Sequence, residues 1–190
     1  MTTQNQAQAA TESRWVFDPS HTQVEFSARH LGMMTVRGNF LDVTANGFID
    51  PQHPEASSVD VTILTASIRT NNPQRDNDLR TSHFLEADKY PTMTFKSTKI
   101  EQTGADTYDM TGELTIKGTT RSVTLVVKKY GEFNDPMMGH RIAYGAEGKI
   151  NRKDFGMSFN ALLDGRLVVS EEINISIEGE FVEQQQEPTA

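Results

Sequence analysis

Apolar and polar residues alternate along most of the chain between positions 14 and 182. A period of two places successive side chains on opposite faces of a strand, which is typical of half-buried antiparallel sheets. Six stretches show this alternation most clearly: TQVEFSARHL from Thr22, SVDVTIL from Ser58, YDMTGELTI from Tyr108, RSVTLVVKK from Arg121, RIAYGAEGKI from Arg141 and INISIEGEF from Ile173. The pattern therefore predicts an all-β fold.

Turn residues separate these strands. The KGTT stretch at 117–120 lies between two strong strand patterns and predicts a hairpin turn. The Asn-Gly pair at 46–47 predicts another. Close spacing of this kind favours a sandwich or an up-and-down barrel. We expect one domain over 14–182, flanked by disordered tails at 1–13 and 183–190, which are rich in Gln, Ala, Thr and Glu.

One polar segment, Arg69–Pro91, interrupts the alternation and is called the lid segment below. The Asn-Pro pair at 72–73 supplies a good N-cap and first-turn residue, and 74–81 favours helix. Leu79 is the one apolar residue of its first two turns, and a Phe-Leu pair follows at 84–85. The segment is therefore predicted to form a short helical lid over a sheet edge or a barrel mouth.

The lid segment does not fit a known metal motif. A calcium loop starting at Asp76 would place Thr81 where glycine is needed and Ala87 where a carboxylate is needed. Asp78 and His83 are separated by about 140° around a helix, which does not suit a zinc pair. No metal site is predicted. The charges of Arg75, Asp76 and Arg80 are expected to form a solvated face with local ion pairs, with contact to a ligand's polar head as the alternative.

The sequence gives no catalytic motif. It contains no cysteine, no G-x-S-x-G stretch and only scattered histidines, so no catalytic residues are predicted. A triad assembled from distant positions stays open. His30 shares the apolar face of its strand with Val24, Phe26 and Ala28. It is either a hydrogen-bonded core histidine or a polar group inside a cavity that contacts a ligand's head.

Charge and composition narrow the functional classes. A formal net charge of −8 in 190 residues argues against nucleic-acid binding, which relies on basic patches. The chain has no apolar run of about 20 residues, so no membrane-spanning helix is expected. The N-terminus as written has no basic region followed by an apolar one, which predicts a cytoplasmic protein, or a periplasmic or secreted one if the chain is already processed.

Four stretches, taken together and in order, resemble the YceI-like family of polyisoprenoid-binding, lipocalin-like proteins. They are WVFDPSHTQVEFSARHLGMMTVRGNF (15–40), SIRTNNPQRDNDLRTSHFLEADKYPTMTFKS (67–97), GELTIKGTTRSVTL (112–125) and INRKDFGMSF (150–159). The chain departs from the family at Asp78, where an RD-x-H-L motif has histidine, and at Leu85, where a second phenylalanine is common. A head-group role is therefore not carried over to position 78.

The resemblance implies an extended antiparallel lipocalin-like β-barrel of about eight strands with one short helical lid. It also implies an elongated apolar tunnel that holds a long isoprenoid or isoprenoid quinone-like lipid, no catalytic residues, and a homodimer. No other cofactor is expected. The implied function is non-catalytic binding, storage or transport of this lipid. The alternatives are a lipid-modifying enzyme whose residues converge in the cavity and a solid-core dimeric interaction module.

Strand parity and position in the family together select the residues expected to bind the ligand. His30 and Arg29 are the candidates for fixing the head group. Periodicity alone does not distinguish a hollow barrel from a packed one. The expected ligand-binding residues are Phe26, Ala28, His30, Phe40, Ile63, Leu79, Phe84, Phe95, Leu114, Leu125, Phe155 and Phe159.

Overall fold

The computed structural model describes residues 14–184, most of which form one antiparallel sheet. Ten strands pair in the order β3-β4-β6-β7-β8-β9-β12-β1-β2-β5, and β10 and β11 form a separate small hairpin. The all-β fold is confirmed, with more strands than the eight or so predicted. The strands are β1 (Arg14–His30), β2 (Met34–Phe40), β3 (Val43–Phe48), β4 (Ser58–Leu64), β5 (Ile68–Arg69), β6 (Thr92–Gln102), β7 (Thr107–Ile116), β8 (Thr119–Asp135), β9 (Gly139–Asn151), β10 (Leu162–Leu163), β11 (Arg166–Leu167) and β12 (Glu172–Gln184).

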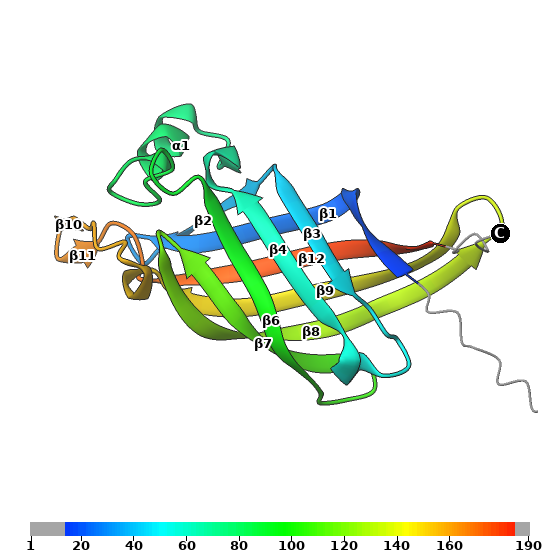
Figure 1. The fold of residues 1–190 in the computed structure, drawn as a ribbon. Helices are drawn as coiled ribbons and strands as arrows, with labels where there is room; N and C mark the ends of the chain where they lie inside the picture. Colours follow the sequence, from blue (N-terminus) through cyan, green and yellow to red (C-terminus); the bar gives the residue numbers. More distant parts are fainter. Residues whose placement is uncertain (1–13, 185–190) are drawn as a thin grey trace, which may run out of the picture.

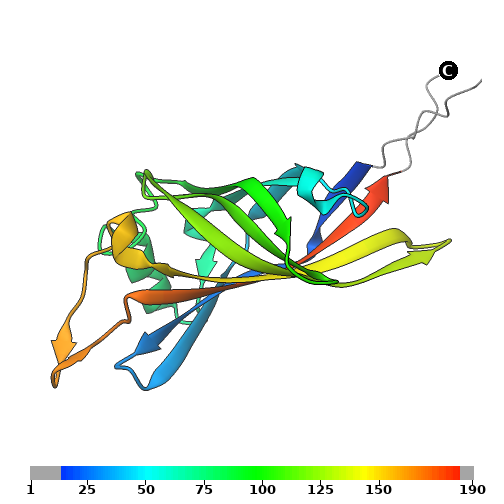
Figure 2. The ribbon, with the colours of Figure 1, turned by 90° about the horizontal axis from the view of Figure 1, so that it is seen from below.

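The sheet curls into an elongated half-barrel (Figures 1 and 2). Its outer strands are β3 and β5, and β3 also lies beside β1. The helix α1 (Pro73–Arg80) and the β10–β11 hairpin lie at one end, called the lid end below, and the β8–β9 hairpin projects at the other (Figure 1). Three short 3-10 helices, η1 (Pro54–Ala56), η2 (Thr65–Ser67) and η3 (Arg152–Phe155), complete the fold.

The predicted turns have different outcomes. Between β7 and β8, Lys117 has φ 50° and Gly118 has φ 70°, so this tight hairpin turn is confirmed. The turn predicted at Asn46-Gly47 is wrong, because both residues lie inside β3 and pair with β4. Gly47 faces the backbone of Ser58 so closely that a Cβ atom would clash with the Ser58 carbonyl. The glycine serves close strand packing there.

The strand borders differ slightly from the predicted domain. The last strand, β12, continues to Gln184, past the expected end at 182. The predicted tails at 1–13 and 185–190 lie outside the described residues. Within 14–184, no helix is long and apolar enough to cross a membrane.

The core divides into three clusters along the barrel. At the lid end, Ile68, Phe84 and Phe155 belong to a buried cluster. In the middle, Phe95 and Leu125 pack with Ala146. At the far end the buried cluster contains Trp15, Ile49 and Ile142. Between these clusters the inward faces of the strands enclose a continuous space, which positions the candidate site.

Candidate functional site

The lid segment forms the helix that the sequence predicts. The helix α1 begins at Pro73, and the Asn72 side chain accepts a hydrogen bond from the Arg75 N–H at 3.1 Å, as an N-cap does. The helix ends at Arg80, one residue before the predicted end. Arg80 then donates to the backbone carbonyls of Ala66 and Ile68, each at 2.8 Å, so its guanidinium ties the helix to the rim of the barrel.

The charged face of α1 is not the solvated ion-pair surface that the sequence suggested. Asp76 is buried and accepts hydrogen bonds from the Thr70 N–H at 2.8 Å and from the Thr70 hydroxyl at 2.5 Å. Arg75 donates to the same Thr70 hydroxyl at 2.7 Å and to the Thr70 carbonyl at 2.9 Å. These charges hold α1 against the chain leaving β5, because a buried carboxylate needs donors in place of water.

A cavity of about 300 Å³ lies inside the half-barrel. Its wall is made by inward-facing side chains of the long strands and, at the lid end, by residues of the lid segment. The residues are almost all aliphatic or aromatic, as in sites for small apolar ligands. The described part of the barrel is therefore hollow, which settles the question that strand periodicity left open.

Most of the predicted ligand-binding residues line this cavity. They come from β1, β2, β4, β6, β7, β8 and the lid segment, so one space collects side chains that are far apart in the sequence. Whether they contact a lipid stays a prediction. The residues in the wall are Phe26, Ala28, Phe40, Ile63, Leu79, Phe84, Phe95, Leu114 and Leu125.

The predicted head-group residues lie outside the cavity. His30 is exposed, and its Nδ1 lies 3.0 Å from the Val168 carbonyl. Its backbone also bridges to Val169, because β1 ends there against the segment that precedes β12. Arg29 is exposed and donates to the Met33 carbonyl at 3.4 Å. The expectation that these two residues face a ligand inside the cavity is wrong for this structure.

Two predicted phenylalanines also lie outside the wall. Phe155 is 1% exposed and packs in the lid-end core cluster with Phe84 and other side chains. Phe159 is 37% exposed and stacks on the His83 ring at 4.5 Å between centroids. Its edge also meets Phe84, whose ring does line the cavity. Phe159 therefore contacts a lining residue, and Phe155 shares a core cluster with that residue.

The expected ligand-binding residues did not include the polar residues of the wall. Tyr108 and Tyr144 line the cavity, and burial raises the pKa of the Tyr144 phenol above its usual value. Arg152 also lines it, at the end of β9. A signal existed in the sequence, because Tyr144, Ile150 and Arg152 all stand at even positions and so share one face of a continued strand.

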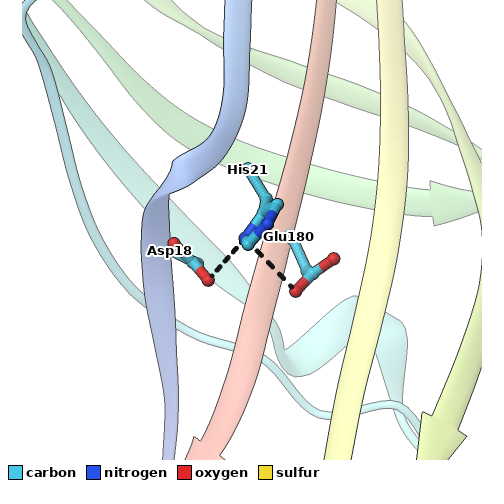
Figure 3. Close-up of side chains that lie close together, drawn as sticks. All are labelled: Asp18, His21 and Glu180. Carbon is cyan, nitrogen blue, oxygen red and sulfur yellow. Dashed lines mark hydrogen bonds and ion pairs between the residues drawn. The ribbon is translucent and has the colours of Figure 1, made fainter. Parts of the chain in front are cut away.

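A separate polar cluster lies on β1 and β12, outside the set of residues that line the cavity (Figure 3). Asp18, His21 and Glu180 bring potential metal-binding atoms within 4.8 Å of one another. His21 Nδ1 is 3.0 Å from Asp18 and 4.0 Å from Glu180. The Arg141 guanidinium, however, hydrogen-bonds to both carboxylates, at 3.0 Å in the case of Asp18. Arg141 therefore supplies the positive charge that a cation would bring.

The cluster has a structural effect on β1. The hydrogen bond from His21, followed by that from Arg141 and the Ser20 N–H, lowers the pKa of Asp18 to about 2. The pairing register of β1 with β12 shifts between Asp18 and Gln23, so the cluster holds this irregular stretch to β9 and β12. Its chemistry is that of an ion-pair network.

The fold and cavity can now be compared with known proteins. Residues 15–181 match the model of the YceI-like domain. Protein YceI of Escherichia coli O157:H7 and of Salmonella arizonae are each 40% identical to the chain over 159 residues, covering 84% of this chain and 81% of the relative.

Solved structures have a similar fold. The YCEI protein of Campylobacter jejuni has a TM-score of 0.71 at 34% identity, covering 83% of this chain and 90% of that one. BcnA of Burkholderia cenocepacia has a TM-score of 0.77 at 23% identity, covering 86% and 98%. A polyisoprenoid binding domain from Saccharophagus degradans, implicated in plant cell wall breakdown, has a TM-score of 0.63 at 14% identity, covering 90% and 99%. By its matched domain and its 40% identical relatives, the chain belongs to the YceI-like family.

Proposed function

We propose that the cavity binds a long-chain polyisoprenoid or a similar amphiphilic lipid, and that the protein stores or transports this lipid without changing it chemically. The observation that carries the proposal is the continuous apolar cavity of about 300 Å³ inside the half-barrel. Its wall runs from Phe84 at the lid end to Phe181 near the far end. The shape suits an extended chain.

The hydrophobic effect supplies the driving force. Each CH₂ group moved from water into an apolar site gains about 0.8 kcal/mol. An extended hydrocarbon chain therefore gains most from a wall with few polar atoms. The same wall gains little from a small polar metabolite, which would leave its hydrogen-bonding groups unpaired. The likeness in fold to the polyisoprenoid binding domain from Saccharophagus degradans supports the choice of lipid class.

The polar groups in the wall support a binding role. Among the described lining residues the charged ones are Glu25, Asp50 and Arg152, and none of the lining residues is a histidine. The one lining serine, Ser57, donates to the Asp50 carbonyl and accepts from the Asp50 N–H, so its hydroxyl is held by the backbone. Nucleophilic catalysis needs a base that accepts the proton of the nucleophile, and the Ser57 hydroxyl donates to a backbone carbonyl instead.

Charge placed on either side of one strand tests the proposal. Phe95 faces the cavity, and its neighbour Thr94 is exposed on the outer face of β6. We expect Phe95→Glu to abolish binding of geranylgeraniol. A bound hydrocarbon chain would remove the carboxylate from water, which costs free energy unless the group is protonated. Thr94→Glu is expected to bind like the wild type. Displacement of an apolar fluorescent dye by the prenol measures both.

A second variant keeps the test valid if Phe95→Glu does not fold. Phe26→Glu places the charge on β1, where the side chain is only half-buried, and is expected to lose binding in the same way. Circular dichroism and thermal unfolding confirm that each variant is folded. A folded Phe95→Glu or Phe26→Glu protein that binds geranylgeraniol with wild-type affinity contradicts the proposal.

A further inference from the structure

Arg152 is a buried cation in an apolar wall. It follows β9 and begins the short helix η3, and its side chain is 1% exposed. It lies beside the lid-end cluster, since its guanidinium carbon is 5.9 Å from the centre of the Phe84 ring and Phe84 belongs to that cluster. Such an arginine needs an explanation, because charged side chains are rarely fully buried without a partner.

Two of its three guanidinium nitrogens are bonded to backbone. Nε donates to the Ser170 carbonyl at 3.0 Å, and Nη1 donates to the Met157 carbonyl at 2.5 Å. These bonds hold the side chain in one orientation. The third nitrogen, Nη2, is buried and has no acceptor within residues 14–184. A buried donor without an acceptor costs roughly 1–3 kcal/mol, so a hydrogen bond from Nη2 to an acceptor atom of a ligand would recover free energy.

The charge of Arg152 is also unpaired by any carboxylate that the structure describes. Glu171, the carboxylate that acts on the Arg152 pKa, is engaged with Lys153, whose Nζ lies 2.5 Å from it. Burial lowers the pKa of the Arg152 guanidinium, and Glu171 acts in the opposite direction. Arginine stays protonated in proteins even so. The Phe84 ring gives the cation partial stabilisation through its π face, which does not replace an anion.

The other charges in the wall lie away from this point. Asp50 follows β3 and accepts from the N–H groups of Gln52 and His53, which places it in the β3–β4 connection near η1. Glu25 is exposed, on β1. Arg152 is thus the one cation among the described lining residues, and it gives the cavity two unlike ends.

We propose that Arg152 recognises the polar head of the bound lipid, and that this head is an oxygen-rich anion of the phosphate class held at the lid end. The inference rests on the proposed function, since it assigns a head group and an orientation to the same ligand. The hydrocarbon tail runs away from Arg152 past Phe95 toward Tyr144 and Phe181. Guanidinium groups match phosphate oxygens well, because their N–H donors are planar and fixed in direction.

Two ligands with one chain and different heads test this. Isothermal titration compares geranylgeranyl phosphate with geranylgeraniol on wild type and on Arg152→Gln. We expect the wild type to bind the phosphate at least about tenfold more tightly than the alcohol, as one charge-assisted hydrogen bond predicts. In Arg152→Gln the two affinities become equal within about twofold on the same scale, while the affinity for the alcohol changes little.

Controls separate recognition from general charge and from folding. Lys153→Gln removes the adjacent cation, which is half-exposed and paired with Glu171, and is expected to keep the preference for the phosphate. Arg152→Lys keeps the charge but loses the planar donors, and is expected to keep part of the preference. Because Arg152 also braces two carbonyl groups, thermal unfolding is recorded for each variant, and Arg152→Lys serves if Arg152→Gln does not fold.

The outcomes are distinct. Equal wild-type affinity for the phosphate and the alcohol overturns the assignment of Arg152 and leaves the proposed function standing. A folded Arg152→Gln that keeps the tenfold preference also overturns the assignment. Wild-type protein that binds neither ligand overturns the assignment and the proposed function together.

Discussion

At the residue scale, Asp18 makes stability depend on pH. Its pKa is lowered from 3.8 to about 2, first by the hydrogen bond from His21 and then by Arg141 and the Ser20 N–H. A carboxyl with a depressed folded-state pKa stabilises the protein above its unfolded pKa. That contribution is lost as the pH falls from about 4 toward 2. Acid therefore weakens the contact that holds β1 to β9 and β12.

The variant Asp18→Asn tests this contribution. We expect it to be less stable than the wild type by roughly 1–2 kcal/mol at pH 7, and the difference to vanish near pH 2. Urea unfolding followed by tryptophan fluorescence measures it, because Trp15 is buried in the same strand. A difference in stability that is the same at pH 2 and pH 7 contradicts the role given to Asp18.

The sequence predicted apolar residues of the site better than polar ones. Alternation fixed the inward face of β1 and β7, so Phe26 and Leu114 were found. It failed at His30, because β1 ends there and the exposed His30 ring lies against the Val168 carbonyl, in the segment that precedes β12. It also missed Arg152, because sequence reasoning assigns arginine to the surface. The buried state of Arg152 depends on two backbone carbonyls, those of Met157 and Ser170, whose positions the local sequence pattern does not reveal.

At the element scale, the attachment of α1 depends on one buried carboxylate. Asp76 accepts from the backbone and the hydroxyl of Thr70, and both bonds are lost in Asp76→Ala. We expect this variant to lose roughly 1–3 kcal/mol of unfolding free energy, since a buried Thr70 N–H is left without an acceptor. Hydrogen exchange in the lid segment is expected to accelerate along with it.

Asp78 provides a matched control on the same helix. Its side chain is 49% exposed and meets His83 at the surface, at 3.1 Å. Asp78→Ala is therefore expected to change the unfolding free energy by less than about 0.5 kcal/mol. Chemical denaturation of the two variants in parallel decides the matter. Equal losses for Asp76→Ala and Asp78→Ala contradict the idea that the buried contact anchors the lid segment.

Local sequence signals predicted the helix start and one hairpin correctly and another turn wrongly. The helix start at Asn72-Pro73 was found because both the cap and the proline act on their own backbone. The hairpin at Lys117-Gly118 was found for the same reason. The Asn-Gly pair at 46–47 misled, because there the glycine is needed for close approach to Ser58 in the neighbouring strand. That contact is tertiary and leaves no local signal.

At the scale of the whole molecule, glycines on neighbouring strands leave room for large side chains and so help to keep the barrel hollow. A Cβ atom at Gly148 would lie 2.5 Å from Leu125 Cδ2, and one at Gly112 would clash with the Phe95 ring. These glycines let the Leu125 and Phe95 side chains pack close to the backbone of the neighbouring strand. Strand periodicity predicts which residues face inward, but the space between them depends on sheet curvature, and alternation does not encode that.

Native mass spectrometry of the purified protein, followed by organic extraction, tests the central claim most directly. We predict a stoichiometric extra mass of isoprenoid size on each chain of 21.2 kDa, released intact by the solvent, and the homodimer expected from the family resemblance in the same spectrum. A ligand-free mass that does not change after incubation with isoprenoid quinones and isoprenoid phosphates would contradict lipid binding.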